Sequence, residues 1–222
     1  AANLSTLGGK TAGTVTVTNA VAIEGTAAEV TAALVTDGTK VEVDDPTVNI
    51  TTTPTIGALN LIAAETTGVV TATLAADSLA NLAALNTAGT DQITVTVNDA
   101  NAAPLTAANL STLGGKTAGT VTVTNAVAIT GDHDQVTAAL VTAGTKVEVD
   151  DATVTINDAN ATAITAAELS AVGGATLGTV TVTNAVAIEG TAAEVTAALV
   201  TAGTKVEVDD ATVSITTTPT IG

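Results

Sequence analysis

The sequence predicts an α/β solenoid of about eight right-handed coils, each with short parallel β-strands and one short helix. The first observation behind this fold class is repetition: residues 166–222 (copy 3) repeat residues 1–57 (copy 1) at a constant offset of 165 with eight positions changed, and residues 107–156 between them form a further copy (copy 2). The second is a strand-like run that begins again every 23–33 residues. The third is an interior that must be built from Val, Ile, Leu and Ala, because the chain has no Phe, Trp, Tyr, Met or Cys.

The first kind of strand is a run of alternating threonine and valine. In residues 120–124 the alternation places Val121 and Val123 on one face and the threonines on the other, as in a half-buried strand. Asn125 predicts a corner, after which residues 126–129 resume extended structure.

The next coil keeps the valines and exchanges the outward threonines for charged residues. Its strand begins at Lys146, carries Glu148 and Asp150 in the outward positions, and reaches a corner at Asp151. The same alternation of a threonine coil with an acidic coil begins at Thr14, Lys40, Thr179 and Lys205. Strands that return to the same place through a helix are parallel, and such crossovers are right-handed.

Capping residues predict a short helix between strands. Thr191 followed by Glu194 makes a capping box, and the apolar residues of 195–199 form a narrow stripe on one helix face. The box occurs again at Thr26 with Glu29 and at Thr165 with Glu168.

The repeat is least regular in residues 50–90. Residues 69–73 are predicted to form a short strand without a clear second partner, and residues 75–86 to form a helix with leucines at a spacing of three. We expect the whole chain, residues 1–222, to be a single continuous solenoid section of a longer tandem-repeat protein.

Composition excludes several classes of function. The formal net charge of −17, with five lysines and no arginine, leaves no basic patch for nucleic acid, and no aromatic ring is present to stack on a base. No apolar run approaches the roughly 18 residues of a membrane-spanning helix, so we expect no insertion into a membrane. One histidine and no cysteine allow no specific catalytic grouping, and we predict that the protein is not an enzyme.

The one histidine lies in a segment that differs from the other copies. Asp132, His133 and Asp134 occupy a helix start where the third copy has a threonine and two alanines. Asp132 can cap the helix, and acidic groups favour its first turn. We expect an exposed cap with a solvated imidazole; the alternative is a single metal site formed by the three residues.

Paired aspartates recur at equivalent corners of the acidic coils. They are Asp44 and Asp45, Asp150 and Asp151, and Asp209 and Asp210. Each pair is expected beside an asparagine corner of the neighbouring coil, at Asn19, Asn125 or Asn184. Two interpretations are open: a ladder of side chains that cap the backbone turns, or calcium bound by oxygens of two adjacent coils.

Rows of outward threonines raise one further possibility. Residues 14–18 have the Thr-x-Thr spacing of ice-binding solenoids, but the acidic coil that begins at Lys40 interrupts the row. Ice binding is therefore a remote alternative, because threonine on the solvated face of a strand needs no special function.

Three runs share an Ala/Thr/Val/Gly texture: residues 105–114 (LTAANLSTLG), 178–186 (GTVTVTNAV) and 191–195 (TAAEV). In these runs the chain resembles very large repetitive cell-surface proteins of bacteria, particularly the tandem-repeat surface and adhesin proteins of cyanobacteria. The resemblance implies a structural or adhesive role outside the cell, and it carries over no functional residue.

The predicted function is that of an extracellular or cell-surface structural protein, which forms a rod, fibre or surface layer by coil stacking and self-association. Its partners would be other copies of itself or adjoining repeats, and it would need no cofactor. The alternative is a calcium-dependent adhesin stalk or ligand-binding repeat, in which calcium binds at the acidic corners.

Overall fold

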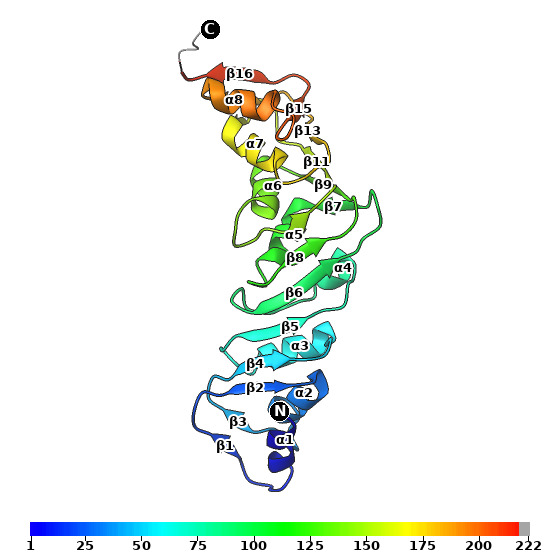
Figure 1. The fold of residues 1–222 in the computed structure, drawn as a ribbon, viewed down its shortest axis with the longest axis vertical. Helices are drawn as coiled ribbons and strands as arrows, with labels where there is room; N and C mark the ends of the chain where they lie inside the picture. The colour runs from blue at the N-terminus through cyan, green and yellow to red at the C-terminus, as the bar shows by residue number, and fades with distance from the viewer. Residues whose placement is uncertain (218–222) are drawn as a thin grey trace. The chain divides into compact units, whose positions relative to one another are not determined.

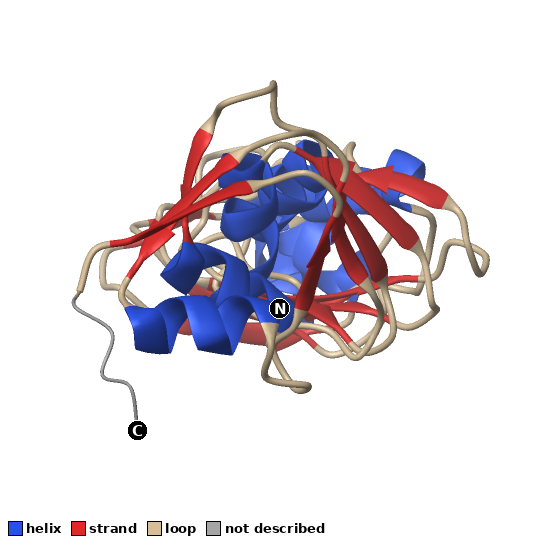
Figure 2. Ribbon diagram, turned by 90° about the horizontal axis from the view of Figure 1, so that it is seen from above, coloured by secondary structure: helices blue, strands red, loops and turns tan. Residues whose placement is uncertain are grey.

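The computed structural model describes residues 1–217 and consists of short helices and parallel strands. Figure 1 labels these elements, and Figure 2 distinguishes the helices, in blue, from the strands, in red. The end of the third copy, residues 218–222, lies outside the described residues. The α/β class and the parallel strands agree with the sequence prediction.

The chain divides into two compact units. The first contains residues 1–96 and 115–121, and the second contains residues 97–114 and 122–222. That residues 1–222 form one continuous solenoid section stays a prediction.

The first unit contains copy 1 and the irregular segment that follows it. Its helices are α1 (Ala2–Gly8), α2 (Ala27–Leu34), α3 (Ile56–Ala63) and α4 (Leu79–Leu82). Its strands are β1 (Thr16–Val17), β2 (Ala22–Gly25), β3 (Glu42–Val43), β4 (Thr47–Ile50), β5 (Val70–Thr73) and β6 (Gln92–Val97), whose last residue belongs to the second unit. β1 pairs with β3, while β2, β4, β5 and β6 lie side by side in that order (Figure 1).

The second unit contains most of copy 2 and the described part of copy 3. Its helices are α5 (Ala107–Gly114), α6 (His133–Leu140), α7 (Ala166–Gly173) and α8 (Ala192–Leu199). Its strands are β7 (Pro104–Thr106), β8 (Val121–Val123), β9 (Ala128–Gly131), β10 (Glu148–Val149), β11 (Thr153–Ile156), β12 (Ala163–Thr165), β13 (Val180–Val182), β14 (Ala187–Gly190), β15 (Val206–Val208) and β16 (Thr212–Ile215). The first residue of β8 belongs to the first unit.

Three sets of parallel strands are paired within the second unit. β8 pairs with β10, five strands follow the order β7-β9-β11-β13-β15, and three follow the order β12-β14-β16. In the first unit Thr16 pairs with Glu42 and Thr71 with Gln92, and in the second unit Thr153 pairs with Ala128. Each strand therefore pairs with a strand roughly one predicted repeat away.

The three copies share one layout of helix, two strands, helix and two strands. In each copy the two first strands pair with each other (β1 with β3, β8 with β10, β13 with β15), and so do the two second strands (β2 with β4, β9 with β11, β14 with β16). The helices also pack in pairs: α1 with α2, α5 with α6, and α7 with α8.

Aliphatic side chains fill the interior of both units, as the composition requires. Fully buried examples are Leu59, Ile62, Ile93, Leu110, Ile129, Ile156, Leu169 and Ile188. The valine alternation predicts the burial of β8 correctly, since Val121 and Val123 are buried while Thr122 between them is less so. The buried face is thus set by a period of two along each strand.

Capping residues start the helices as predicted. Thr26, Thr165 and Thr191 each make a capping box with the glutamate three residues later. Asp132 caps α6 by accepting a hydrogen bond from the backbone N–H of Gln135.

The irregular segment differs from the prediction in two places. β5 has two partners, β4 and β6, where a clear second partner was not expected. The helix expected over residues 75–86 is only the four-residue α4, because Ser78 caps it and its side-chain oxygen accepts from the N–H of Asn81.

Candidate functional site

A Thr-x-Gly motif joins one repeat to the preceding one. In copy 3 the hydroxyl of Thr176 lies 2.7 Å from the carbonyl oxygen of Ala152 and accepts a hydrogen bond of 3.0 Å from the N–H of Gly178. A Cβ atom on Gly178 would lie 2.2 Å from that carbonyl oxygen, so the position admits only glycine without displacement. The Thr176 hydroxyl and the absence of a side chain at Gly178 together allow this segment to pack directly on the backbone at Ala152.

The motif makes the same contact twice in the first unit. Thr117 lies 2.9 Å from the carbonyl oxygen of Ile93, and Gly119 donates a 2.8 Å hydrogen bond to Thr117. Thr66 donates to the carbonyl oxygen of Pro46 at 2.6 Å, and Gly68 donates to Thr66. Thr117 and Thr176 are only 5% and 8% exposed, which shows that the docked backbone covers them.

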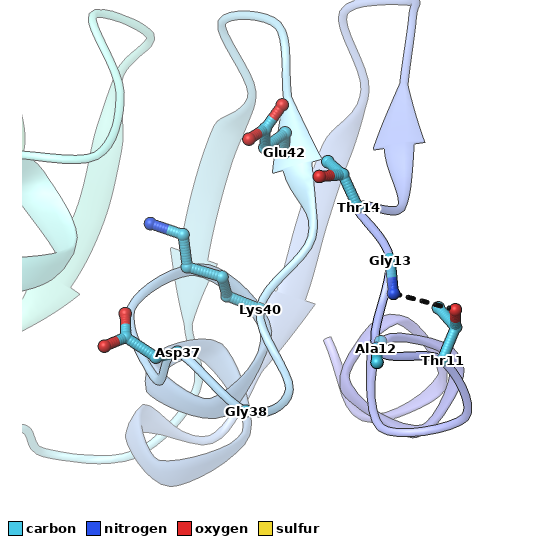
Figure 3. Close-up of a pocket in the computed structure, with 9 residues that line it drawn as sticks. Thr11, Ala12, Gly13, Thr14, Asp37, Gly38, Lys40 and Glu42 are labelled. Atoms are coloured by element: carbon cyan, nitrogen blue, oxygen red, sulfur yellow. Dashed lines mark hydrogen bonds between the residues drawn. The ribbon is translucent and has the colours of Figure 1, made fainter.

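In copy 1 the same motif has no docked neighbour among the described residues. Thr11 is exposed, and its hydroxyl accepts a 3.0 Å hydrogen bond from the N–H of Gly13 (Figure 3). A Cβ atom on Gly13 would have only the Thr11 hydroxyl, at 3.5 Å, within 4 Å. A hollow of about 300 Å³ lies here, lined mainly by polar residues that include Asp37, Lys40 and Glu42 (Figure 3).

The strand register places one predicted acidic corner beside an asparagine corner. Val123 pairs with Val149, so Asn125 and Asp151, two residues further on, lie at neighbouring corners. The amide of Asn125 donates to the carbonyl oxygen of Asp99 at 2.7 Å, and the amide of Asn184 donates to that of Asp158 at 2.6 Å. These asparagines therefore bind the backbone at Asp99 and Asp158 and not at the predicted aspartate pairs, so the corner-ladder interpretation of those pairs stays a prediction.

The aspartates themselves have varied surroundings. Asp45 adopts a left-handed conformation (φ 48°), and its carboxylate accepts hydrogen bonds from the backbone N–H and the hydroxyl of Thr67. The other five are Asp44, Asp150, Asp151, Asp209 and Asp210, and all are exposed. Within residues 1–217 no three His, Cys, Asp or Glu side chains form a group that could hold a metal ion. Calcium binding at these corners stays a prediction.

His133 does not have the solvated imidazole that the sequence predicts. Its side chain is 16% exposed, and its Nδ1 lies 2.7 Å from Oδ1 of Asp158, whose side chain is 5% exposed. The backbone N–H of His133 also donates to Oδ2 of Asp158 at 2.7 Å. Asp134 is 3.5 Å from Nε2 on the exposed side, and Asp132 is occupied as the helix cap. The expectation of a solvated cap is therefore wrong for the imidazole and right for Asp132.

The carboxylates around His133 favour its protonated form. Burial of the imidazole lowers its pKa, but the hydrogen bond and charge of Asp158, with the charges of Asp134 and Glu168, outweigh burial and raise the pKa above the ordinary value of 6.5. The pKa of Glu168 is lowered, mainly by its side-chain hydrogen bond to Thr165. The group is an ion pair that joins the start of α6 to the loop that contains Asp158.

Two buried aspartates were missed by the sequence reasoning. Asp158 is one; the other is Asp91, which is 3% exposed and accepts hydrogen bonds from the N–H groups of Val70 (2.8 Å) and Ala88 (2.9 Å). A signal for Asp158 exists in the repeat itself. Where copy 2 has His133 and Asp158, copy 3 has Ala192 and Thr217 at the same spacing, so both members of the pair change together.

Comparison of the chain with models of protein families, with curated proteins and with solved structures gives no match. None of the helices in residues 1–217 has the length and apolar character needed to cross a membrane.

Proposed function

We propose that this chain is a structural repeat protein that works outside the cell or on its surface. In this proposal the paired helices and parallel strands form a right-handed α/β solenoid, and copies of the protein associate into a fibre or surface layer. The observation that carries the proposal is the Thr-x-Gly contact, which joins successive repeats at Pro46, Ile93 and Ala152. Because each repeat uses the same contact to pack on the preceding one, further repeats can be added to the array in the same way.

The chemistry of the contact supports a structural role. It uses a hydroxyl, a glycine and backbone carbonyls, which are satisfied within the chain and leave no reactive group free for a substrate. The His133 and Asp158 pair also fits this role, since both ring nitrogens of the imidazole face carboxylates.

A calcium-dependent adhesin stalk is the second candidate. The observation that favours it is the exposure of Asp150 and Asp151 at a corner that neighbours Asn125. Oxygen ligands from two adjacent corners are the kind that calcium takes.

Electron microscopy of negatively stained protein at rising concentration, with and without a calcium chelator, tests the two candidates. Long uniform fibres or sheets that survive chelation support the structural proposal. Separate particles at every concentration contradict it. Assemblies that dissolve in the chelator would instead favour the calcium-dependent candidate.

A further inference from the structure

The sequence contains four Asn-x-Ser/Thr motifs, which are the signal for attaching a sugar to the asparagine amide in exported proteins. The motifs begin at Asn3, Asn49, Asn109 and Asn160. All four asparagines are exposed, so exposure alone does not choose between them. An enzyme that reads the motif must reach both the amide nitrogen and the hydroxyl two residues later. The local structure around each motif therefore decides which of them the folded chain can offer.

Three of the motifs are held in regular secondary structure. Asn3 and Asn109 lie in α1 and α5, where the hydroxyl of Ser5 or Ser111 donates to a backbone carbonyl of the same helix at 3.0 or 3.1 Å. Asn49 lies inside β4, which is paired on both sides, with β2 and β5. A helix or an inner strand cannot enter the cleft of an enzyme unless its backbone hydrogen bonds break.

The fourth motif lies in an exposed turn. Asn160 and Ala161 form the turn in the loop between β11 and β12, and Ala161 has a left-handed conformation (φ 63°). Oδ1 of Asn160 accepts a 3.3 Å hydrogen bond from the backbone N–H of Ala185, which fixes the side-chain amide. Within residues 1–217, Nδ2 of Asn160 has no hydrogen-bond acceptor and the hydroxyl of Thr162 has no partner. Both groups that the motif requires are therefore available.

A second loop of the same unit has the same structure without the motif. Asn101 is the counterpart of Asn160 at an offset of 59, and its Oδ1 accepts a 3.2 Å hydrogen bond from a backbone N–H. Ala102 has φ 59°, and its N–H donates to a backbone carbonyl at 2.7 Å, as does that of Ala161. Ala103 stands where the other loop has Thr162. The chain thus contains a natural control that lacks only the hydroxyl of the motif.

We propose that Asn160 is the site at which the folded chain accepts an N-linked oligosaccharide. The donor is an oligosaccharide carried on a lipid diphosphate. Nδ2 of Asn160 forms a bond to the anomeric carbon of the sugar while the bond from that carbon to the diphosphate breaks. The diphosphate leaves with the lipid and takes up the proton that the amide nitrogen loses. The inference rests on the proposed function, because a chain outside the cell passes the membrane that holds such donors.

The test uses the folded chain, an oligosaccharyltransferase and a lipid-linked oligosaccharide. Intact mass and peptide mapping by mass spectrometry count and locate the added glycans. We expect one glycan for each folded chain, on Asn160. Synthetic peptides that span the motifs of Asn49 and Asn109 are the control for enzyme activity, and we expect both peptides to be modified although the same motifs in the folded chain are not.

Two matched pairs of variants test the role of the hydroxyl and of the turn. Thr162→Val keeps the shape of the side chain and removes the hydroxyl, so it should abolish modification of Asn160. Ala103→Thr completes the motif in the second loop and should add a second glycan, on Asn101. Ala103→Val, which is almost the same shape as the threonine variant, should add none.

Mass spectrometry of the chain isolated from the organism that makes it supplies the second readout, and we expect a glycan on Asn160. An unmodified Asn160 in either material would overturn the inference. Equal modification of Asn49 or Asn109 in the folded chain would show that the turn does not select the site. These outcomes leave the proposed function in place, since that is tested by electron microscopy. Separate particles whose Asn160 carries a glycan would instead contradict the fibre or layer and leave the modification site standing.

Discussion

The imidazole Nδ1 of His133 lies 2.7 Å from Oδ1 of Asp158, and the two residues replace a neutral pair found in the other copies. In copy 3 the backbone N–H of Ala192 donates to the hydroxyl of Thr217 at 3.2 Å. In copy 1 the same bond joins Ala27 to Thr52 at 3.0 Å. Copy 2 keeps the backbone bond, with a carboxylate as acceptor, and adds a side-chain ion pair to it.

Replacing one residue of the His133 and Asp158 pair should lower the free energy of unfolding more than replacing both. His133→Ala leaves the buried carboxylate of Asp158 with a backbone partner only, and we expect a loss of roughly 1–3 kcal/mol in the free energy of unfolding. The double variant His133→Ala with Asp158→Thr recreates the pair of copy 3 and should recover most of that loss. Urea unfolding near pH 6 measures both. Additive losses in the double variant would show that the two side chains are not coupled.

The same pair predicts how stability depends on pH. Because the pKa of His133 is raised in the folded chain, its contribution is fully present below the ordinary value of 6.5 and is lost as the pH rises through the folded-state pKa. The melting temperature of the wild type should therefore fall, relative to that of the double variant, as the pH is raised from below 6.5 through the higher folded-state pKa of His133. Parallel melting curves for the two proteins across this range would contradict the assignment.

Acidification should destabilise the fold at the capping glutamates, whereas for His133 it is a rise in pH that destabilises it. The pKa of Glu194 is lowered by hydrogen bonds from the backbone and side chain of Thr191, and that of Glu168 mainly by the side chain of Thr165. Their contributions are present above the ordinary value of 4.5 and are lost as the pH falls through the lower folded-state pKa values. Glu194→Gln should reduce the loss of helix signal on acidification, measured by circular dichroism and compared with Glu189→Gln.

Glycine at the stacking contact should be far less replaceable than glycine elsewhere. Gly178→Ala places a Cβ atom 2.2 Å from the carbonyl oxygen of Ala152, and we expect a loss of about 1–3 kcal/mol or more. Gly144→Ala meets no atom within 4 Å and should leave stability unchanged or raise it by about 0.4–1 kcal/mol. Chemical denaturation of the two variants checks the difference. Equal effects would show that the close backbone approach is not needed.

Calcium removal separates the two candidate functions in the unassembled chain. Under the structural proposal the melting temperature should be the same in excess calcium and in chelator, because hydrogen bonds hold corners such as that of Asn125. A rise of several degrees with calcium, which is lost in the variant Asp150→Asn with Asp151→Asn, would favour the adhesin candidate.

The regular copies could be predicted from the sequence because each local signal agreed with the next. The alternation around Val121 and Val123 specifies a buried face, and Thr191 with Glu194 specifies a helix start. The irregular segment was harder, since the leucines after Ala75 have a helical spacing while Ser78 and its neighbours begin the helix only at Leu79. In this segment the Ser78 cap sets where α4 begins. Leu85 continues the helical spacing of leucines but lies after the end of α4, where it is buried.

The contact between His133 and Asp158 could not be predicted from local sequence patterns, for a different reason. The two residues are far apart in the sequence and meet only because the strands between them pair at the same spacing, as Thr153 does with Ala128. Composition and capping rules treat each residue with its near neighbours, so they assign His133 to solvent. The simultaneous change of Ala192 and Thr217 between copies carries the missing information.

The offset of 59 between copies 2 and 3 has a consequence for how such a chain can change in length. β7 and β12 are counterparts at an offset of 59, and both lead directly into a helix, at Ala107 and Ala166. Recombination that joins Thr106 to Ala166 would delete the block 107–165 and still supply every remaining strand with a partner of the same kind. Whole blocks can therefore be gained or lost in frame with the architecture, whereas the loss of a single residue within a strand moves the rest of that strand's side chains to the opposite face.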